Sequence, residues 1–209
     1  AVIFGLLNII NFAHGAMYML GAMTTVLMFD YLGVNYWVAL LLAPLLVGAF
    51  GVVIEYFLLR RIAGQDHIYS LLLTFGVALI ITGVLVNWFG VSGLRYTMPD
   101  MFKGGVNLGF MFMPYYRAWV IVAALVVCFG TWFVIEKTKL GAYLRAGTED
   151  SQLMQGFGIT VPLLISLTYG FGVALAAFAG VLAAPIYSVT PVMGSATLIT
   201  VFAVVVIGG

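Results

Sequence analysis

Residues 68–89 read IYSLLLTFGVALIITGVLVNWF and contain no Asp, Glu, Lys or Arg. A helix needs about 20 apolar residues to cross the hydrocarbon core of a bilayer, and this stretch meets that requirement. Of all 209 residues, 64% are apolar and 7% are charged. A soluble domain carries about 25% charged residues, so the composition excludes a soluble globular protein, a nucleic-acid-binding protein and a disordered segment. The sequence predicts an integral membrane protein.

Further apolar stretches predict an all-α, polytopic transmembrane helix bundle, because helices satisfy their own backbone groups in lipid. Residues 1–29 are too long for one plain span, and polar residues interrupt them. We expect the tail of one span, an irregular polar stretch and then a helical piece. The chain opens and ends inside apolar runs, so we expect a fragment, truncated at both ends, of a longer protein with a single transmembrane domain over residues 1–209. The other predicted spans are residues 37–54, 118–135 and 161–184, and residues 198–209 begin a further one.

The distribution of Lys and Arg predicts the orientation of these spans. Residues 60–67 and 136–160 together carry five Lys or Arg, and residues 90–117 carry three. Short cytoplasmic loops are enriched in basic residues. We therefore expect 60–67 and 136–160 to be cytoplasmic and 30–36, 90–117 and 185–196 to face outward.

The sequence offers little for catalysis. The two histidines, His14 and His67, lie far apart, and the single cysteine, Cys128, lies in an apolar span. A phosphate-binding glycine loop followed by Lys is missing, and so is a GxSxG nucleophile motif. We expect no enzyme activity, no metal and no cofactor.

The most polar stretch inside an apolar segment is NIINFAHG at residues 8–15. Polar groups at membrane depth face a bundle interior or a water-filled cavity. Three interpretations stay open: a hydrogen-bonded packing knot, a break beside the substrate path, and a loop outside the membrane. The candidate pathway residues are Asn8, Asn11, His14 and Gly15.

Two other features concern packing at membrane depth. Glu55 precedes Arg60 and Arg61 near the end of its span, and we expect it to pair with one of them or to extend to the interface. Small residues also recur every fourth position, which lets another helix approach closely. This small-residue stripe consists of Gly172, Ala176, Gly180 and Ala184.

The predicted cytoplasmic loop, about 136–160, contains the pattern of a short amphipathic helix. Thr148 can cap such a helix, and Glu149 and Asp150 suit the positive end of its dipole. Gly158 is a natural helix stop. We expect this helix to dock on a protein partner rather than on lipid headgroups, which favour Lys and Arg. Its predicted apolar face consists of Leu153, Met154 and Phe157.

Two motifs resemble a known family. NFAHG at 11–15, followed by YMLGA at 18–22, resembles the early motif of the membrane (permease) subunit of bacterial branched-chain amino-acid ABC importers. Gly141-x3-Arg145-Ala146-x2-Glu149-Asp150, followed by Gly158, resembles the cytoplasmic coupling loop of that family.

The resemblance implies a division of labour. Cytoplasmic ABC ATPase subunits bind ATP and drive transport, a second permease subunit completes the pathway, and a periplasmic or extracellular substrate-binding protein delivers substrate. It places the chain in the bacterial inner membrane, with no nucleic-acid partner. Related permeases for urea or short amides share this layout, and an ion-coupled carrier stays an alternative.

Overall fold

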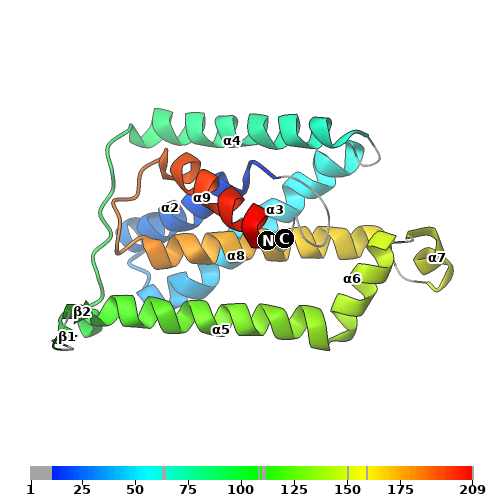
Figure 1. Ribbon diagram of the computed structural model, residues 1–209. Helices are drawn as coiled ribbons and strands as arrows, with labels where there is room; N and C mark the ends of the chain where they lie inside the picture. Colours follow the sequence, from blue (N-terminus) through cyan, green and yellow to red (C-terminus); the bar gives the residue numbers. More distant parts are fainter. Residues whose placement is uncertain are drawn as a thin grey trace. The chain divides into compact units, whose positions relative to one another are not determined.

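The computed structural model describes residues 11–62, 65–107, 109, 112–149, 151–158 and 160–208, and these residues are mostly helical (Figure 1). One short antiparallel hairpin pairs Gly105–Asn107 with Phe112–Pro114. The elements are α2 (His14–Leu32), α3 (Tyr36–Phe57), η1 (Leu59–Ile62), α4 (His67–Phe89), η2 (Asp100–Phe102), β1 (Gly105–Asn107), β2 (Phe112–Pro114), α5 (Tyr115–Lys137), α6 (Lys139–Glu149), α7 (Ser151–Gly156), α8 (Val161–Ala183) and α9 (Met193–Gly208).

The helices confirm the predicted all-α membrane architecture. In the part of the chain that the structure describes, four helices are long and apolar enough to cross a bilayer, and each contains nearly all of one predicted span. The predicted start at 198 is too late, because α9 already begins at Met193. The four candidate spans are Tyr36–Ile62, His67–Phe89, Tyr115–Lys137 and Val161–Ala183.

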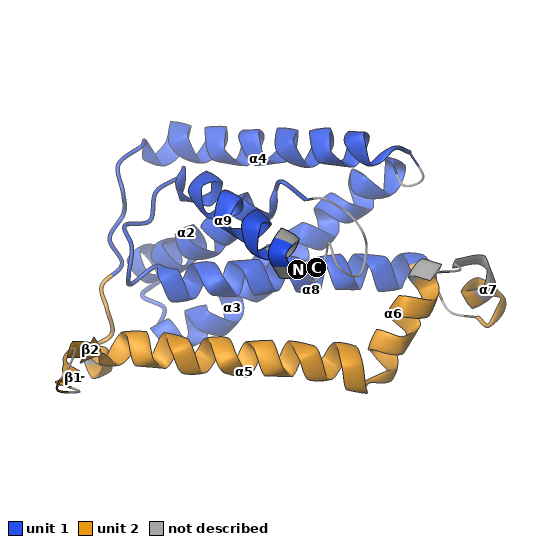
Figure 2. Cartoon of the chain, in the orientation of Figure 1, with its two compact units in different colours: residues 1–96, 162–209 blue, residues 97–161 orange. Residues whose placement is uncertain are grey.

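The chain divides into two compact units (Figure 2). We call residues 1–96 and 162–209 the bundle unit, and residues 97–161 the elbow unit. The bundle unit contains α2, α3, α4 and α9 with nearly all of α8, and the elbow unit contains the hairpin, α5, α6 and α7.

Helix α8 packs closely on α2 through the predicted small-residue stripe. A Cβ atom added at Gly180 would lie 2.0 Å from the Tyr18 carbonyl oxygen, and one added at Gly21 would lie 2.2 Å from the Ala177 carbonyl oxygen. Only glycine permits backbones to approach this closely. The stripe is therefore confirmed at Gly180 as a helix-packing surface.

A second crossing, between α8 and α3, was not predicted. A Cβ atom at Gly170 would lie 2.4 Å from Val52, and one at Gly48 would lie 2.9 Å from Ala174. Helix α8 therefore packs on α2 and on α3, and half of its most apolar segment is buried (50%).

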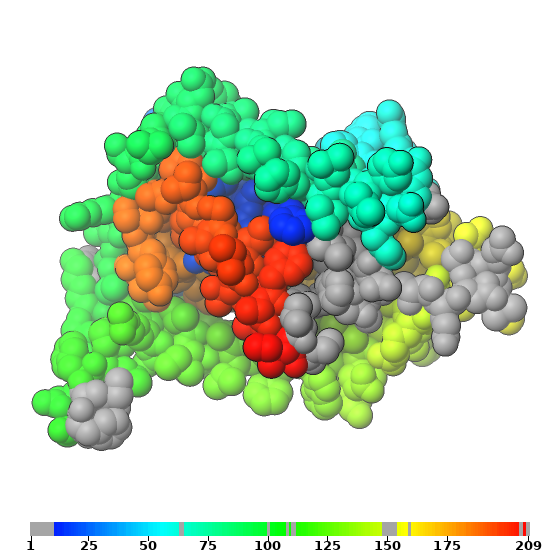
Figure 3. Space-filling model, turned by 45° about the horizontal axis from the view of Figure 1, so that its top comes forward, coloured from blue at the N-terminus to red at the C-terminus, as the bar shows by residue number. Residues whose placement is uncertain are grey.

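Helix α4 instead presents an apolar face outward. Only 17% of its most apolar segment is buried, and its side chains form part of the surface in Figure 3. Ile68, Leu72 and Trp88 are among its exposed residues. Such a surface suits contact with lipid, where exposed apolar side chains carry no penalty.

At one end of the bundle unit, the loop after α4 pairs with the loop after α8, and we call this backbone pairing of Leu94 with Val189 the strap. Leu94 and Val189 exchange two backbone hydrogen bonds of 2.9 Å. Tyr96 is buried against the rings of Phe29 and Tyr36. Burial, together with Tyr36 and Asp30 nearby, raises the pKa of Tyr96 to about 12. The strap thereby links the loop after α4 to the loop after α8.

Candidate functional site

The first candidate site is the polar break that precedes α2, and Asn11 is fixed in it by both ends of its amide. Its Nδ2 donates to the Tyr169 hydroxyl at 2.9 Å, and its Oδ1 accepts from the Ala13 amide at 2.9 Å. Asn11 is only 7% exposed. A buried amide needs such partners, since an unsatisfied polar group costs about 1–3 kcal/mol.

A second set of contacts joins the break to α4. The Phe12 amide donates to Thr74 Oγ1 at 3.1 Å, and that hydroxyl donates to the Leu71 carbonyl at 3.1 Å. The Phe12 ring also packs on Phe75 and Phe202. The backbone that leaves helical geometry here is therefore satisfied by protein groups, as membrane depth requires.

Gly15 has a packing role. A Cβ atom added there would lie 2.3 Å from the Gly194 carbonyl oxygen, and one added at Gly194 would lie 2.3 Å from the Gly15 carbonyl oxygen. The first turns of α2 and α9 thus touch backbone to backbone. The packing alternative accounts for both Asn11 and Gly15.

The break is shorter than predicted. In the described part of this stretch, residues 11–13 are non-helical, and His14 and Gly15 already form the first turn of α2. The Asn11 side chain accepts from the Ala13 amide in a local turn directly before the helix. His14 is half-buried, and its ring has no hydrogen-bond partner among the described residues. Asn8 lies outside the described residues.

The prediction that Glu55 pairs with Arg60 or Arg61, or extends to the membrane interface, is wrong. Its side chain is 3% exposed and accepts a hydrogen bond from the Ser166 hydroxyl of α8. Arg60 instead lies over the Tyr56 ring, 5.4 Å from its centroid. Position 55 faces α8 because the helix turns it to the side of Gly48 and Gly51, which α8 covers. Spacing along the chain did not reveal this inward face.

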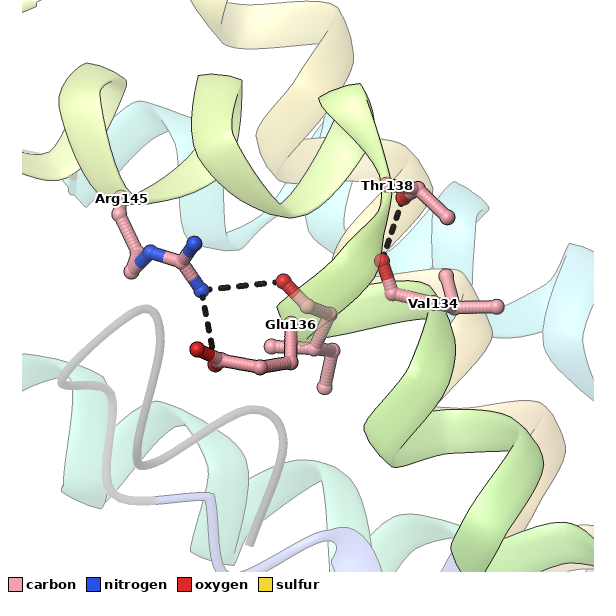
Figure 4. Close-up of polar contacts among 5 residues, drawn as sticks. Val134, Glu136, Thr138 and Arg145 are labelled. Carbon is pink, nitrogen blue, oxygen red and sulfur yellow. Dashed lines mark hydrogen bonds and ion pairs between the residues drawn. The ribbon is translucent and has the colours of Figure 1, made fainter.

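The second candidate site is the elbow between α5 and α6, shown in Figure 4. Arg145 Nη1 donates to the Ile135 carbonyl at 3.0 Å and lies 3.4 Å from Glu136 Oε2. The Thr138 hydroxyl donates to the Val134 carbonyl. The last carbonyls of a helix have no partner within it, so two side chains from the following segment satisfy the end of α5.

Gly141 completes the elbow. A Cβ atom added there would lie 1.7 Å from the Ile135 carbonyl oxygen. Gly141 and Arg145 are four residues apart and therefore share one face of α6. The Gly141-x3-Arg145 motif thus places one face of α6 on a single residue of the spanning helix α5. That i, i+4 spacing was the signal in the sequence for a joint, although Gly141 was not among the predicted site residues.

The predicted docking helix has the wrong boundaries. Thr148 does not cap it, because Thr148 and Glu149 lie in the last turn of α6, which begins at Lys139. The elbow contacts of Gly141 and Arg145 fix α6 early in the loop, so the helix continues past the expected cap. A separate helix, α7, spans Ser151–Gly156. Asp150 lies outside the described residues.

Two residues of the predicted apolar face differ in exposure. Met154 is 7% exposed, whereas Phe157, one turn later, is 74% exposed. Leu153 lies in α7. Gly158 adopts a left-handed conformation (φ 80°) just after the helix, which confirms its role as a stop. Phe157 is a large apolar side chain that this region leaves accessible.

Among the residues that the structure describes, no group of three or more His, Cys, Asp or Glu could hold a metal ion. The polar break can orient groups inside the bundle, and the elbow can pass a mechanical displacement into a spanning helix.

Comparisons with known proteins agree with a transport role. A family model described as "Branched-chain amino acid transport system / permease component" matches residues 1–209. The high-affinity branched-chain amino acid transport system permease protein BraD of Pseudomonas aeruginosa is 28% identical over 222 residues, which cover 100% of this chain and 72% of that protein. The LivH permease protein of Escherichia coli K12 is 27% identical over 226 residues, which cover 100% of this chain and 71% of that protein.

A relative also occurs outside the bacteria. The probable branched-chain amino acid transport permease protein LivH of Methanocaldococcus jannaschii is 26% identical over 211 residues, which cover 97% of this chain and 65% of that protein. No solved structure matches this chain. With a family match over its whole length and four helices that can cross a bilayer, the chain is a multi-pass membrane protein that belongs to the family of branched-chain amino acid transport permease components.

Proposed function

We propose that this chain is the permease subunit of an ATP-driven importer that carries branched-chain amino acids across the cytoplasmic membrane by alternating access. The family match over residues 1–209 supports the transport role. The elbow supports the proposed coupling to ATP hydrolysis. There, a helical loop packs on the end of the spanning helix α5 and leaves Phe157 exposed.

We propose that cytoplasmic ABC ATPase subunits dock on the segment 145–158. Phe157 would fill an apolar pocket on the partner, and Glu149 and Asp150 would meet basic groups that fix the register. The orientation follows from the basic residues near this end of α5, where Lys137 also lies over the Trp132 ring. ATP would be bound by the partner subunits, so this chain needs no cofactor of its own.

The other proposed partners complete the importer. A second permease subunit, alike or related, would form the other half of the pathway, and a substrate-binding protein would deliver the amino acid from outside. Family membership supports both proposals. The apolar outward face of α4 would contact the lipid bilayer.

We propose that the pathway passes residues 8–15, with Asn8, Asn11, His14 and Gly15 beside it. Asn11 and Gly15 fix the position of the segment through Tyr169 and Gly194. His14 follows directly and is half-buried, which supports the proposal that its ring contacts the substrate. A His14→Leu variant should then lose uptake while its complex still assembles.

The test is transport by the reconstituted complex. The chain is coexpressed with candidate ATPase subunits, a candidate second permease subunit and a candidate binding protein from the same organism, and the purified complex is placed in liposomes. We expect labelled leucine to accumulate only with ATP, and excess unlabelled urea not to compete. Accumulation of urea in place of leucine would contradict the substrate, and uptake driven by an ion gradient without ATP would contradict the mechanism.

A further inference from the structure

The end of α5 is joined to α6 over a single residue. Helix α5 ends at Lys137 and α6 begins at Lys139, so Thr138 alone, with φ −109° and ψ 159°, connects them. One extended residue between two helices leaves two backbone torsions about which the helices can swivel. Contacts between the helices must therefore set the angle.

Both contacts converge on Ile135. Gly141 meets the Ile135 backbone so closely that an added Cβ would lie 1.7 Å from its oxygen, and Arg145 donates to the same carbonyl at 3.0 Å. The Arg145 charge also lies at the C-terminal end of α5, where the helix dipole favours a cation. Gly141 sets the closest approach and Arg145, one turn along α6, opposes rotation about that point.

The Glu136 carboxylate contributes less. It lies 3.4 Å from Arg145 Nη1, and the two side chains are 52% and 47% exposed. Exposed ion pairs of this kind add little to stability, whereas a charge-assisted hydrogen bond to a carbonyl that lacks a helical partner is stronger. Of these two contacts of Arg145, the cap on Ile135 is the stronger.

We infer that Arg145 is a positioning residue that makes α6 and α5 move together, so that a displacement of α6 by a docked ATPase reaches the spanning helix. This inference rests on the proposed function and deepens it, because it assigns the transmission of force to the Ile135 cap and the docking to the segment beyond it. Removal of the cap then uncouples the subunits without separating them.

The first arm of the test needs no partner. Spin labels are placed at Val126 on α5 and Tyr143 on α6, both exposed, in the full chain in nanodiscs with Cys128→Ser. We expect a narrow distance distribution for the parent chain and for Glu136→Gln, a broad one for Arg145→Gln, and an intermediate one for Arg145→Lys. An Arg145→Gln distance distribution as narrow as that of the parent chain would contradict the inference that Arg145 fixes the angle between α5 and α6.

The second arm measures coupling in the reconstituted importer. For Arg145→Gln we expect ATPase copurification within about twofold of wild type, and substrate transported per ATP to fall about tenfold, the factor that loss of one charge-assisted hydrogen bond produces in an equilibrium. Lys139→Gln, an exposed change on the same helix, is the matched control and should transport like wild type. Unchanged transport per ATP in Arg145→Gln would overturn the transmission role. Failure of the wild-type chain to bind any ATPase would instead reject the proposed function, while the spin-label result would stand.

Discussion

The polar break and the elbow are built from the same kinds of residue, but the polar side chain is buried in the break and half exposed in the elbow. Each combines a glycine in backbone contact with a neighbouring helix and a polar side chain that bonds to another segment. In the break, Asn11 is 7% exposed and both ends of its amide are bonded within the bundle unit. In the elbow, the Arg145 and Glu136 side chains are about half exposed.

Solvent access decides what each region can do. A buried polar group must keep its partners, because their loss costs its full desolvation penalty. The break is therefore a fixed point of the fold. Loss of an exposed contact costs the fold much less, so the elbow contacts can be changed without unfolding the chain.

The largest effect should come from filling the glycine contact at the break. Gly15→Ala places a methyl group 2.3 Å from the Gly194 carbonyl oxygen, where no flexible side chain can yield. We expect a loss of about 3 kcal/mol or more in the free energy of unfolding, seen as loss of the monodisperse peak in fluorescence-detected size-exclusion chromatography.

Gly83→Ala in α4 is the matched control, since nothing lies within 4 Å of a Cβ at that position. It should be as stable as wild type or slightly more stable, because Ala favours a helix over Gly. Equal stability of the Gly15→Ala and Gly83→Ala variants would contradict the close backbone contact at Gly15.

The next effect concerns the Asn11–Tyr169 hydrogen bond. Asn11→Leu leaves the Tyr169 hydroxyl buried without this partner, and we expect the free energy of unfolding to fall by about 1–3 kcal/mol. Tyr169→Phe removes the other group, and the double variant should lose less than the sum of the two changes. Additive losses in thermal unfolding would show that the two side chains do not interact in the folded protein.

The sequence predicts what depends on local composition. Residues 68–89 form α4 because an uninterrupted apolar run needs no knowledge of its neighbours. The Asn11–Tyr169 bond joins residues 158 positions apart, and Ser166 reaches Glu55 across α8 and α3, so neither pairing follows from spacing. Thr148 satisfied the local rule for a helix cap, but the tertiary contacts of Gly141 begin α6 earlier and override that rule.

A smaller effect on stability is expected when the elbow glycine is filled. Gly141→Ala forces the start of α6 away from Ile135, but the helix can swing into solvent. We expect trypsin cleavage after Lys137 and Lys139 to become several times faster, while the unfolding of the bundle unit changes by less than about 1 kcal/mol. Gly156→Ala, which has open space around the added methyl, should be cleaved at the wild-type rate; equal rates for both variants would contradict a contact at Gly141.

The central claim is that the break supports the fold, while the elbow region binds the partner. The most direct test measures the ratio of copurified ATPase to folded permease for Asn11→Leu and for Phe157→Ala. Phe157 is 74% exposed, so its truncation should leave stability unchanged, yet it removes an anchor worth about 1.5–3 kcal/mol when fully buried by a partner. We predict that Asn11→Leu yields less folded protein with the wild-type ratio of ATPase to permease, and that Phe157→Ala yields normal amounts with a ratio reduced at least about tenfold. A wild-type ratio for Phe157→Ala together with a reduced ratio for Asn11→Leu would contradict this account.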